Sequence, residues 1–291
     1  MEPQERLLEE HSAGRNQRIS PRDRCVGWPK RDQGLGTSVQ GWSQGEEEVI
    51  RNPDVELSED LLEELKNVSI PTATASLMGS GFQNTYPIGV DPAAVKPGQV
   101  MVGRARTLRF VPMREDLVKA HYDTVEGRPH RQAIESIEPG DILVIDTGGC
   151  MGAGFVGDMF TRRVQARGGT GIVIDGVVRD LVAIQEVGLP VFCRGAHGAG
   201  INRMLMSVGI NEPVQVGGVP VLPGDVLLGD QDGLVVVPPQ EVEYLVEHGF
   251  EHDLQETFTR TKLGEGYPLH RAYPPDEELK KEYEAWKKEQ G

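Results

Sequence analysis

The pattern of apolar and polar positions divides the chain into an irregular beginning and a patterned remainder. Residues 1–50 are polar and rich in Gly, Ser and Arg, with no sustained period, which predicts a flexible or loosely docked extension. The alternative is an arm that wraps a neighbouring subunit, and Trp28 and Trp42 support it because disordered tails rarely contain tryptophan. We predict a core domain over 51–250 and a C-terminal helical extension over 251–291.

Helical spacing of apolar residues predicts a series of amphipathic helices. Ser58 is the expected N-cap of a helix with a leucine stripe, and Pro71 is expected to interrupt the chain before a short second helix over 72–79. Gly188 is the expected C-terminal stop of a later helix. Further helices are predicted over 116–125, 128–137, 159–167, 177–188, 240–258 and 274–290.

Runs of β-prone residues predict strands over 100–110, 142–145, 172–174 and 189–195, with a bulge at Gly103 and a glycine turn after the second strand. Strands alternate with helices between 142 and 195, which predicts parallel pairing. Residues 212–239 contain short runs punctuated by Gly-Gly, Pro-Gly and Asp-Gly, which predicts antiparallel hairpins. The predicted fold class is therefore α/β with mixed sheets.

Composition excludes several classes of function. The chain has 291 residues and a formal net charge of −15, which argues against general binding to a nucleic-acid backbone. Cys25, Cys150 and Cys193 lack the regular spacing of a disulfide framework or zinc cluster, and a cytoplasmic location is expected. The N-terminus shows no secretory signal, and no apolar run approaches the roughly 20 residues that span a bilayer, so no membrane association is expected.

Asp158, Arg179 and Asp180 form the candidate site. Asp158 begins a predicted helix, and the other two follow a predicted strand at the end where α/β sheets bind ligands. Two carboxylates with water oxygens suit Mg²⁺ or Mn²⁺, and an arginine offers donors to a carboxylate or enolate oxygen. The amides of Gly157 to Phe160, at a helix start, suit a carboxylate. From these residues alone, the alternative is a helix cap beside a loop ion pair.

Three strings resemble the RraA-like family: "GDILVIDTGGCMGAGFVGDMFTRRVQARGGTGIVIDGVVRD", "LPVFCRG" and "NEPVQVGGVPVLPGDVLLGDQDGLVVVP". The most specific feature is an acid, a gap of twenty residues and Arg-Asp, matched by Asp158, Arg179 and Asp180. The "GDQDG" turn is a second hallmark, and the resemblance covers about residues 57–250. The family includes class II pyruvate aldolases acting on 4-hydroxy-4-methyl-2-oxoglutarate and 4-carboxy-4-hydroxy-2-oxoadipate, and bacterial regulators that bind ribonuclease E.

The resemblance implies a swivelling β/β/α sandwich as a single catalytic core domain, assembled as homotrimers or hexamers with sites at subunit interfaces. It implies that Asp180 ligates Mg²⁺ or Mn²⁺ directly and that Asp158 reaches the metal through water. Arg179 is implied to hold the pyruvyl group of the substrate and stabilise its enolate. The amides of Gly157, Asp158, Met159 and Phe160 are implied to bind the substrate carboxylate.

The implied reaction is metal-dependent retro-aldol cleavage of a 4-hydroxy-2-oxo acid to pyruvate through a metal-stabilised enolate, with oxaloacetate decarboxylation as a side activity. The expected partners are therefore a small keto acid and further copies of this chain. An RraA-type regulator that binds a ribonuclease without catalysis is the alternative. Those regulators lack some of the metal-site acids, whereas this chain has Asp158 and Asp180, which favours the enzyme.

Other charged residues have a less specific expected role. His197, in the glycine-rich loop "CRGAHGAGINRM", is a candidate proton shuttle or a plain loop histidine, and this loop replaces a shorter one expected of the family. Glu247 and Glu251 are candidates for an acid that assists a neighbouring subunit, with surface solvation as the alternative. Arg104 and Arg109 are expected to pair with acids. The acceptor half of the substrate is left open.

Overall fold

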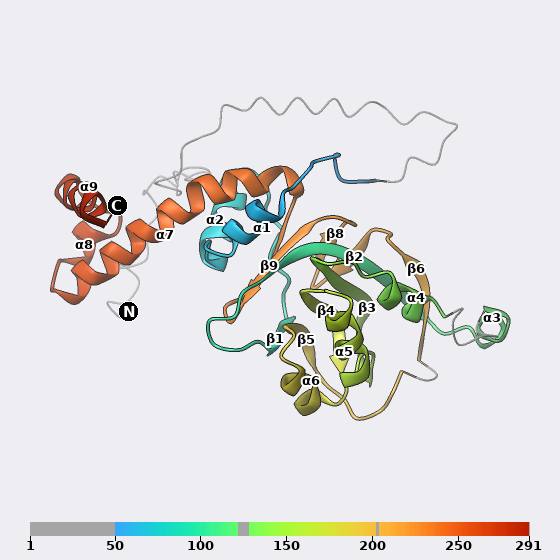
Figure 1. Cartoon of the computed structure of the whole chain (residues 1–291). Helices are drawn as coiled ribbons and strands as arrows, with labels where there is room; N and C mark the ends of the chain where they lie inside the picture. The colour runs from blue at the N-terminus through green and yellow to red at the C-terminus, as the bar shows by residue number, and fades with distance from the viewer. Residues whose placement is uncertain (1–49, 122–127, 202–203, 291) are drawn as a thin grey trace, which may run out of the picture.

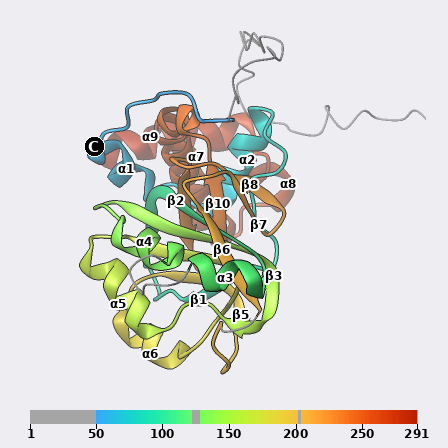
Figure 2. The same cartoon turned by 90° about the vertical axis from the view of Figure 1, so that its right-hand side faces the viewer.

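The computed structural model describes residues 50–121, 128–201 and 204–290 of the chain, so the extension predicted over 1–50 lies almost entirely outside the described residues. A mixed sheet forms the centre of the molecule (Figures 1 and 2). Its strands run in the order β1-β5-β4-β3-β2-β9-β10, and β6 also pairs with β2. The strands are β1 (Asp91–Ala94), β2 (Met101–Pro112), β3 (Asp141–Gly154), β4 (Gly171–Val178), β5 (Val191–Ala196), β6 (Leu205–Ile210), β9 (Val226–Asp230) and β10 (Gly233–Val237).

Strands β2, β3, β4 and β5 pair in parallel, and the remaining pairs of this sheet are antiparallel. A separate hairpin joins β7 (Val214–Val216) to β8 (Val219–Val221). Every residue of β4 is buried, as expected for a central parallel strand covered on both faces. The α/β class with mixed sheets is therefore confirmed.

Each face of the sheet has its own apolar cluster. Ile172 and Ile174 of β4 pack with α4 (Pro129–Glu135), α5 (Asp158–Ala166) and α6 (Leu181–Val187). Val173, whose side chain points the opposite way, packs with the β7–β8 hairpin. A third cluster joins β9 and β10 to α1 (Glu59–Leu65), α2 (Ile70–Gly79) and the first half of α7 (Val242–Gly264), which follows the short helix η2 (Pro239–Glu241). Helix α3 (Glu115–His121) lies apart from these clusters (Figure 1).

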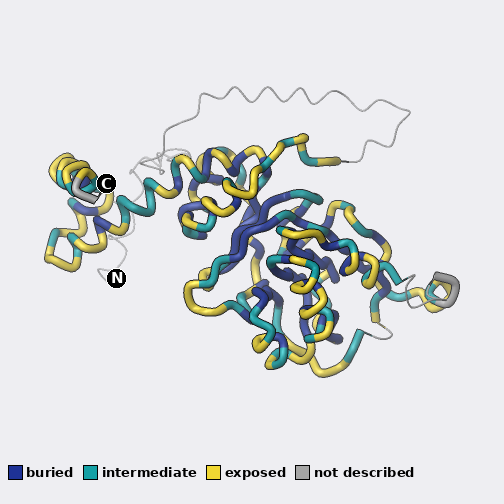
Figure 3. The backbone as a smooth tube through the Cα atoms, in the orientation of Figure 1, coloured by how far each residue is buried: buried dark blue, intermediate teal, exposed yellow. Residues whose placement is uncertain are grey.

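The second half of α7 leaves the body together with α8 (Leu269–Ala272) and α9 (Glu277–Gln290), forming a helical arm, residues 251–290 (Figures 1 and 3). Phe258, Ala272, Leu279 and Tyr283 form the buried centre of a cluster that contains no residue of the sheet. Although burial opposes ionisation of Glu251, hydrogen bonds from Lys287 and Tyr283 lower its pKa. Contacts between α7 and α9 therefore hold the arm together.

Local differences from the expected elements have identifiable causes. Pro71 lies inside the first turn of α2, where its missing N–H is tolerated, and Ser69 caps that helix. Gly103 shows no bulge; an added Cβ there would lie 2.4 Å from the Gly140 carbonyl oxygen, so close backbone packing requires glycine. The bulge in β2 instead lies between Arg109 and Phe110, opposite β6.

Two further boundaries differ from the prediction. The helix predicted over 177–188 begins only at Leu181, because Val177 and Val178 continue the buried strand β4. The glycine turn expected after residue 145 is instead part of a long, irregular β3, whose register against β4 shifts twice. Gly148 and Gly149 both have positive φ, which lets the strand leave its register after Asp146 and pair with β4 again at Cys150.

Candidate active site

The carboxyl ends of β3, β4 and β5 meet at one edge of the sheet, where loop residues bond across the strands. Arg179 directly follows β4, and its backbone N–H donates to the Val156 carbonyl at 2.9 Å. The N–H of His197 donates to Val178 O at 2.8 Å, and the N–H of Gly154 donates to Ala199 O at 2.8 Å. Three segments that are far apart in the chain therefore converge around Arg179.

Three glycines surround the side chain of Arg179. An added Cβ would lie 2.7 Å from Arg179 Cβ at Gly154, 3.3 Å from Arg179 Nε at Gly157 and 3.2 Å from Arg179 Nη1 at Gly200. At Gly157 it would also lie 2.7 Å from Asp180 Oδ2. The structure thus places the residue before Asp158 directly against the Arg-Asp pair.

Asp180 has an unusual backbone conformation for a residue with a side chain. Its φ of 57° and ψ of 36° are left-handed, a conformation that costs on the order of 1 kcal/mol for most residues but less for aspartate. Its Oδ2 accepts a hydrogen bond from Arg179 Nε at 2.9 Å, and it makes no capping bond to α6. The side chains of Arg179 and Asp180 are 50% and 43% exposed, so both are accessible to a ligand.

Asp158 is the first residue of α5, and its side chain is 21% exposed. Its Oδ2 lies 3.6 Å from Arg162 Nε, one turn further along the helix. Gly157 occupies the N-cap position, where glycine has no side chain to accept from the first amides of the helix. These amides are therefore left for water or an anionic ligand.

Met159 and Phe160, the other residues of this helix start, point in different directions. Met159 is exposed, whereas Phe160 is partly buried with its ring 6.0 Å from the ring of His130 on α4. Burial, with the nearby Arg131 and Arg128, lowers the pKa of His130 from 6.5 to about 4. A neutral histidine therefore packs against the ring of Phe160 in the first turn of α5.

A buried polar cluster, which was not predicted from the sequence, lies beside the site. Asp146 and Asp175 stand in register on β3 and β4, and Asp175 forms an ion pair with Arg194 on β5. Asp146 accepts hydrogen bonds from the backbone N–H groups of Gly148 at 2.8 Å and Gln215 at 3.2 Å. The signal for this cluster was an aspartate inside each of two otherwise apolar strands, because such residues are rarely buried without a partner.

Other residues considered from the sequence lie in ordinary environments. Arg104 pairs with Glu59 at 3.0 Å and Arg109 with Glu212 at 2.7 Å, which confirms the expected ion pairs. Glu251 accepts from Tyr283 at 2.8 Å and pairs with Lys287 at 2.5 Å inside the arm, rather than only facing solvent.

Within the described chain, a cluster of three metal-ligating side chains occurs away from this edge. His252, Asp253 and Glu256 on α7 present ligand atoms within 4.8 Å of one another, an arrangement compatible with a divalent cation. However, Asp253 accepts from the Ser69 backbone N–H at 2.7 Å, the Ser69 hydroxyl at 2.9 Å and the Thr72 hydroxyl at 2.5 Å. This carboxylate therefore holds the start of α2 against α7, which explains its position structurally.

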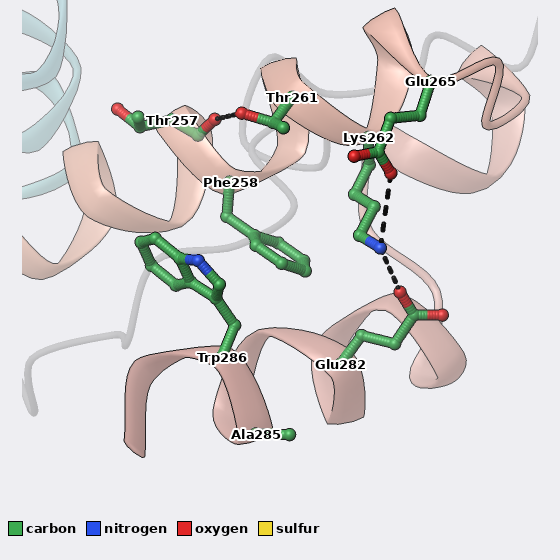
Figure 4. Close-up of a pocket in the computed structure, with 8 residues that line it drawn as sticks. All are labelled: Thr257, Phe258, Thr261, Lys262, Glu265, Glu282, Ala285 and Trp286. Atoms are coloured by element: carbon green, nitrogen blue, oxygen red, sulfur yellow. Dashed lines mark hydrogen bonds and ion pairs between the residues drawn. The ribbon is translucent and has the colours of Figure 1, made fainter. Parts of the chain in front are cut away.

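A hollow of about 390 Å³ lies between α7 and α9 in the arm (Figure 4). Phe258 and Trp286 form an aromatic wall with ring centroids 5.4 Å apart. Lys262 Nζ lies 2.8 Å from a Glu282 carboxylate oxygen and 3.5 Å from one of Glu265. The charged groups that line the hollow are thus paired with one another. The residues of the hollow are distant in sequence from Arg179 and Asp180.

The profile of the RraA-like family, described as Aldolase/RraA, matches residues 73–236, more than half of the chain. The chain belongs to the RraA-like family. A protein of Halalkalibacterium halodurans named "Putative 4-hydroxy-4-methyl-2-oxoglutarate aldolase" is 31% identical over 142 residues, which cover 49% of this chain and 67% of that protein. The resemblance read from the sequence is therefore confirmed at the level of the family.

Solved structures agree with this assignment. RraAS2 of Streptomyces coelicolor, an unusual member of the RNase ES inhibitor RraA protein family, is 34% identical with a TM-score of 0.62, covering 72% of this chain and 99% of that one. An uncharacterized protein of Pseudomonas syringae pv. tomato shares the fold with a TM-score of 0.66 at 23% identity, covering 77% and 97% of the two chains. The body of the protein, meaning the described chain outside the helical arm, therefore has the RraA-like sandwich fold.

Of the helices that the structure describes, none combines the length and apolar character needed to span a bilayer.

Proposed function

We propose that this protein is a divalent-metal-dependent lyase that cleaves a 4-hydroxy-2-oxo acid to pyruvate and a second carbonyl compound. One observation carries the proposal. Gly157, the residue before Asp158, packs against Arg179 and the carboxylate of Asp180, which supports a shared site for Asp158, Arg179 and Asp180. The relatives named as aldolases support the same reaction class.

The residues present fit a hard divalent cation. Asp180 keeps an exposed carboxylate with one oxygen engaged by Arg179, and Asp158 lies one residue from the contact between Gly157 and Asp180. Carboxylate oxygens completed by water are the ligands that Mg²⁺ and Mn²⁺ prefer. We propose that Asp180 holds the cation directly and Asp158 holds it through water. When bound, such a cation supplies Lewis-acid polarisation of the substrate keto oxygen.

The remaining groups bind and orient the substrate. The amides of Gly157, Asp158, Met159 and Phe160 at the start of α5 bind its carboxylate, since this helix end carries partial positive charge and lacks a capping side chain. The guanidinium of Arg179 donates to the 2-oxo oxygen, where negative charge develops as the bond between C3 and C4 breaks. Loss of CO₂ from oxaloacetate leaves the same enolate, so decarboxylation is an expected side activity.

The test is release of pyruvate, coupled to lactate dehydrogenase, from a panel of 4-hydroxy-2-oxo acids and oxaloacetate. We expect activity that EDTA removes and added Mg²⁺ or Mn²⁺ restores. Asp180→Ala and Arg179→Ala are each expected to lower kcat/KM at least about 100-fold with an unchanged circular dichroism spectrum, because each removes charge stabilisation in the transition state. Activity that is indifferent to EDTA and to both substitutions would contradict the proposal.

A second function is favoured by one observation, the 34% identity to an RNase ES inhibitor family member over 99% of that chain. Under this alternative the chain binds a ribonuclease without catalysis. Inhibition of a ribonuclease of that class by the protein, unchanged in Arg179→Ala and without pyruvate release by the wild type, would select it. Assembly as a trimer or hexamer and a cytoplasmic location remain predictions.

A further inference from the structure

His197 lies beside Arg179 on the neighbouring strand. Strands β4 and β5 are parallel with Val178 opposite Ala196 at their ends, and Arg179 and His197 directly follow these two paired residues. The N–H of His197 donates to Val178 O at 2.8 Å, which fixes the backbone at this position. Neighbouring strands are about 4.8 Å apart, so the exposed imidazole belongs to the same edge as the guanidinium.

The hydrogen bonds of the ring determine which nitrogen carries its proton. The backbone N–H of Ala199 donates to His197 Nδ1 at 3.0 Å, so Nδ1 uses its lone pair as an acceptor. A neutral imidazole with an accepting Nδ1 carries its hydrogen on Nε2. If Nδ1 carried the hydrogen, its N–H would face the N–H of Ala199, and neither group could accept a hydrogen bond. The ring is therefore arranged as a fixed donor at Nε2, which differs from the proton shuttle considered from the sequence.

The loop that carries His197 faces one end of the guanidinium. Gly157, before α5, lies against Arg179 Nε, whereas Gly200, in the loop after β5, lies against Arg179 Nη1. A 2-oxo acid whose carboxylate binds at the start of α5 therefore directs its C4 end toward the loop of residues 197–201. A donor on this loop is placed for an oxygen on C4.

We propose that His197 donates a hydrogen bond from Nε2 to the C4 oxygen of the substrate, an inference that rests on the proposed lyase function. In cleavage, solvent water takes the proton of the C4 hydroxyl, and the Nε2 hydrogen stabilises the resulting alkoxide. The alkoxide electron pair forms the new carbonyl bond as the C3–C4 bond breaks, and the C3–C4 pair becomes the enolate of pyruvate. Water then protonates C3. His197 keeps its proton throughout and acts by stabilising charge.

The experiment compares two reactions that share the enolate but differ at C4. The first reaction is cleavage of a 4-hydroxy-2-oxo acid. The second is exchange of the pyruvate methyl hydrogens with deuterated water, measured by NMR; this exchange involves no C4 oxygen.

His197→Ala is expected to lower kcat for cleavage about 100-fold, the usual effect of removing one oxyanion donor, and to change the exchange rate by less than about 3-fold. His197→Gln, which keeps an N–H donor, should recover part of the loss. His270→Ala, at an exposed histidine on α8, is the control and should match the wild type in both reactions.

Equal loss of both reactions in His197→Ala, or loss of neither, would overturn the role of His197 while leaving the lyase in place. If the wild type catalyses neither cleavage nor exchange, the proposed function fails, and the role of His197 fails with it.

Discussion

The position of Arg179 depends on the close approach of three glycines. Its Cβ lies against Gly154 and its guanidinium against Gly157 and Gly200, so close backbone approach helps to set the shape of the site. Sequence reasoning identified Asp158, Arg179 and Asp180 as a set, because the motif spacing is local and specific. It did not identify the role of Gly200, because contact between Gly200 and Arg179 depends on tertiary packing alone.

The close packing of Gly157 against Asp180 leads to a prediction. The Gly157 φ of −119° suits any residue, so the main obstacle to Gly157→Ala is Asp180 Oδ2, 2.7 Å from the added Cβ, with Arg179 Nε less close at 3.3 Å. The carboxylate must move, and we expect a loss of kcat/KM of about 10- to 100-fold with little change in the melting temperature. Gly198→Ala is the matched control, since an added Cβ at Gly198 has no heavy atom within 4 Å. Equal activity of the two variants and the wild type would show that the carboxylate position is unimportant.

At the level of elements, the buried strands and the helix that carries Asp158 were predictable, because continuous apolar runs and helix caps are local signals. Strand β4 extends beyond the predicted run to Val178, which places Arg179 and Asp180 immediately at its end. The irregular course of β3 was not predictable, because it depends on Asp146 and the left-handed Gly148 and Gly149. The second hydrogen bond to Asp146, from Gln215 N–H on β7, forms only when the β7–β8 hairpin packs against β3.

Helix α4 supports α5 through His130, whose pKa is lowered from 6.5 to about 4, and this leads to a prediction about pH. Above about pH 6.5 the ring is neutral in both states, so its contribution to stability is fully present. As the pH falls toward 4, the unfolded chain takes up a proton that the folded chain resists, so stability is lost. We expect this loss to be about 1 to 2 kcal/mol, less than the full shift implies because the ring is partly exposed.

Urea unfolding at about pH 7 and about pH 4.5 measures this effect. His130→Phe keeps an aromatic ring against Phe160 but cannot be protonated, so its stability should fall less between the two pH values than that of the wild type. His270→Phe, on the exposed surface of α8, should behave as the wild type does. Identical pH dependence in all three proteins would contradict a His130 that is held neutral in the folded protein.

The whole molecule combines an RraA-like body with a helical arm. The family match ends at residue 236, and the arm begins fifteen residues later on the second half of α7. The arm's cluster around Phe258 and Tyr283 contains no residue of the sheet, so the arm can vary without altering the edge that carries Arg179. The family and the fold of the body therefore constrain the proposed chemistry, whereas the arm lies outside the residues that match the family.

The central claim is that Asp158, Arg179 and Asp180 form one site per chain for a divalent cation and a 2-oxo acid. Isothermal titration with oxalate, which resembles the enolate of pyruvate, tests it without knowledge of the natural substrate. We predict one oxalate bound per chain in the presence of Mg²⁺, with affinity reduced at least about 100-fold by EDTA, by Asp180→Ala and by Arg179→Ala. Oxalate binding that is unaffected by EDTA and by both substitutions would contradict the claim.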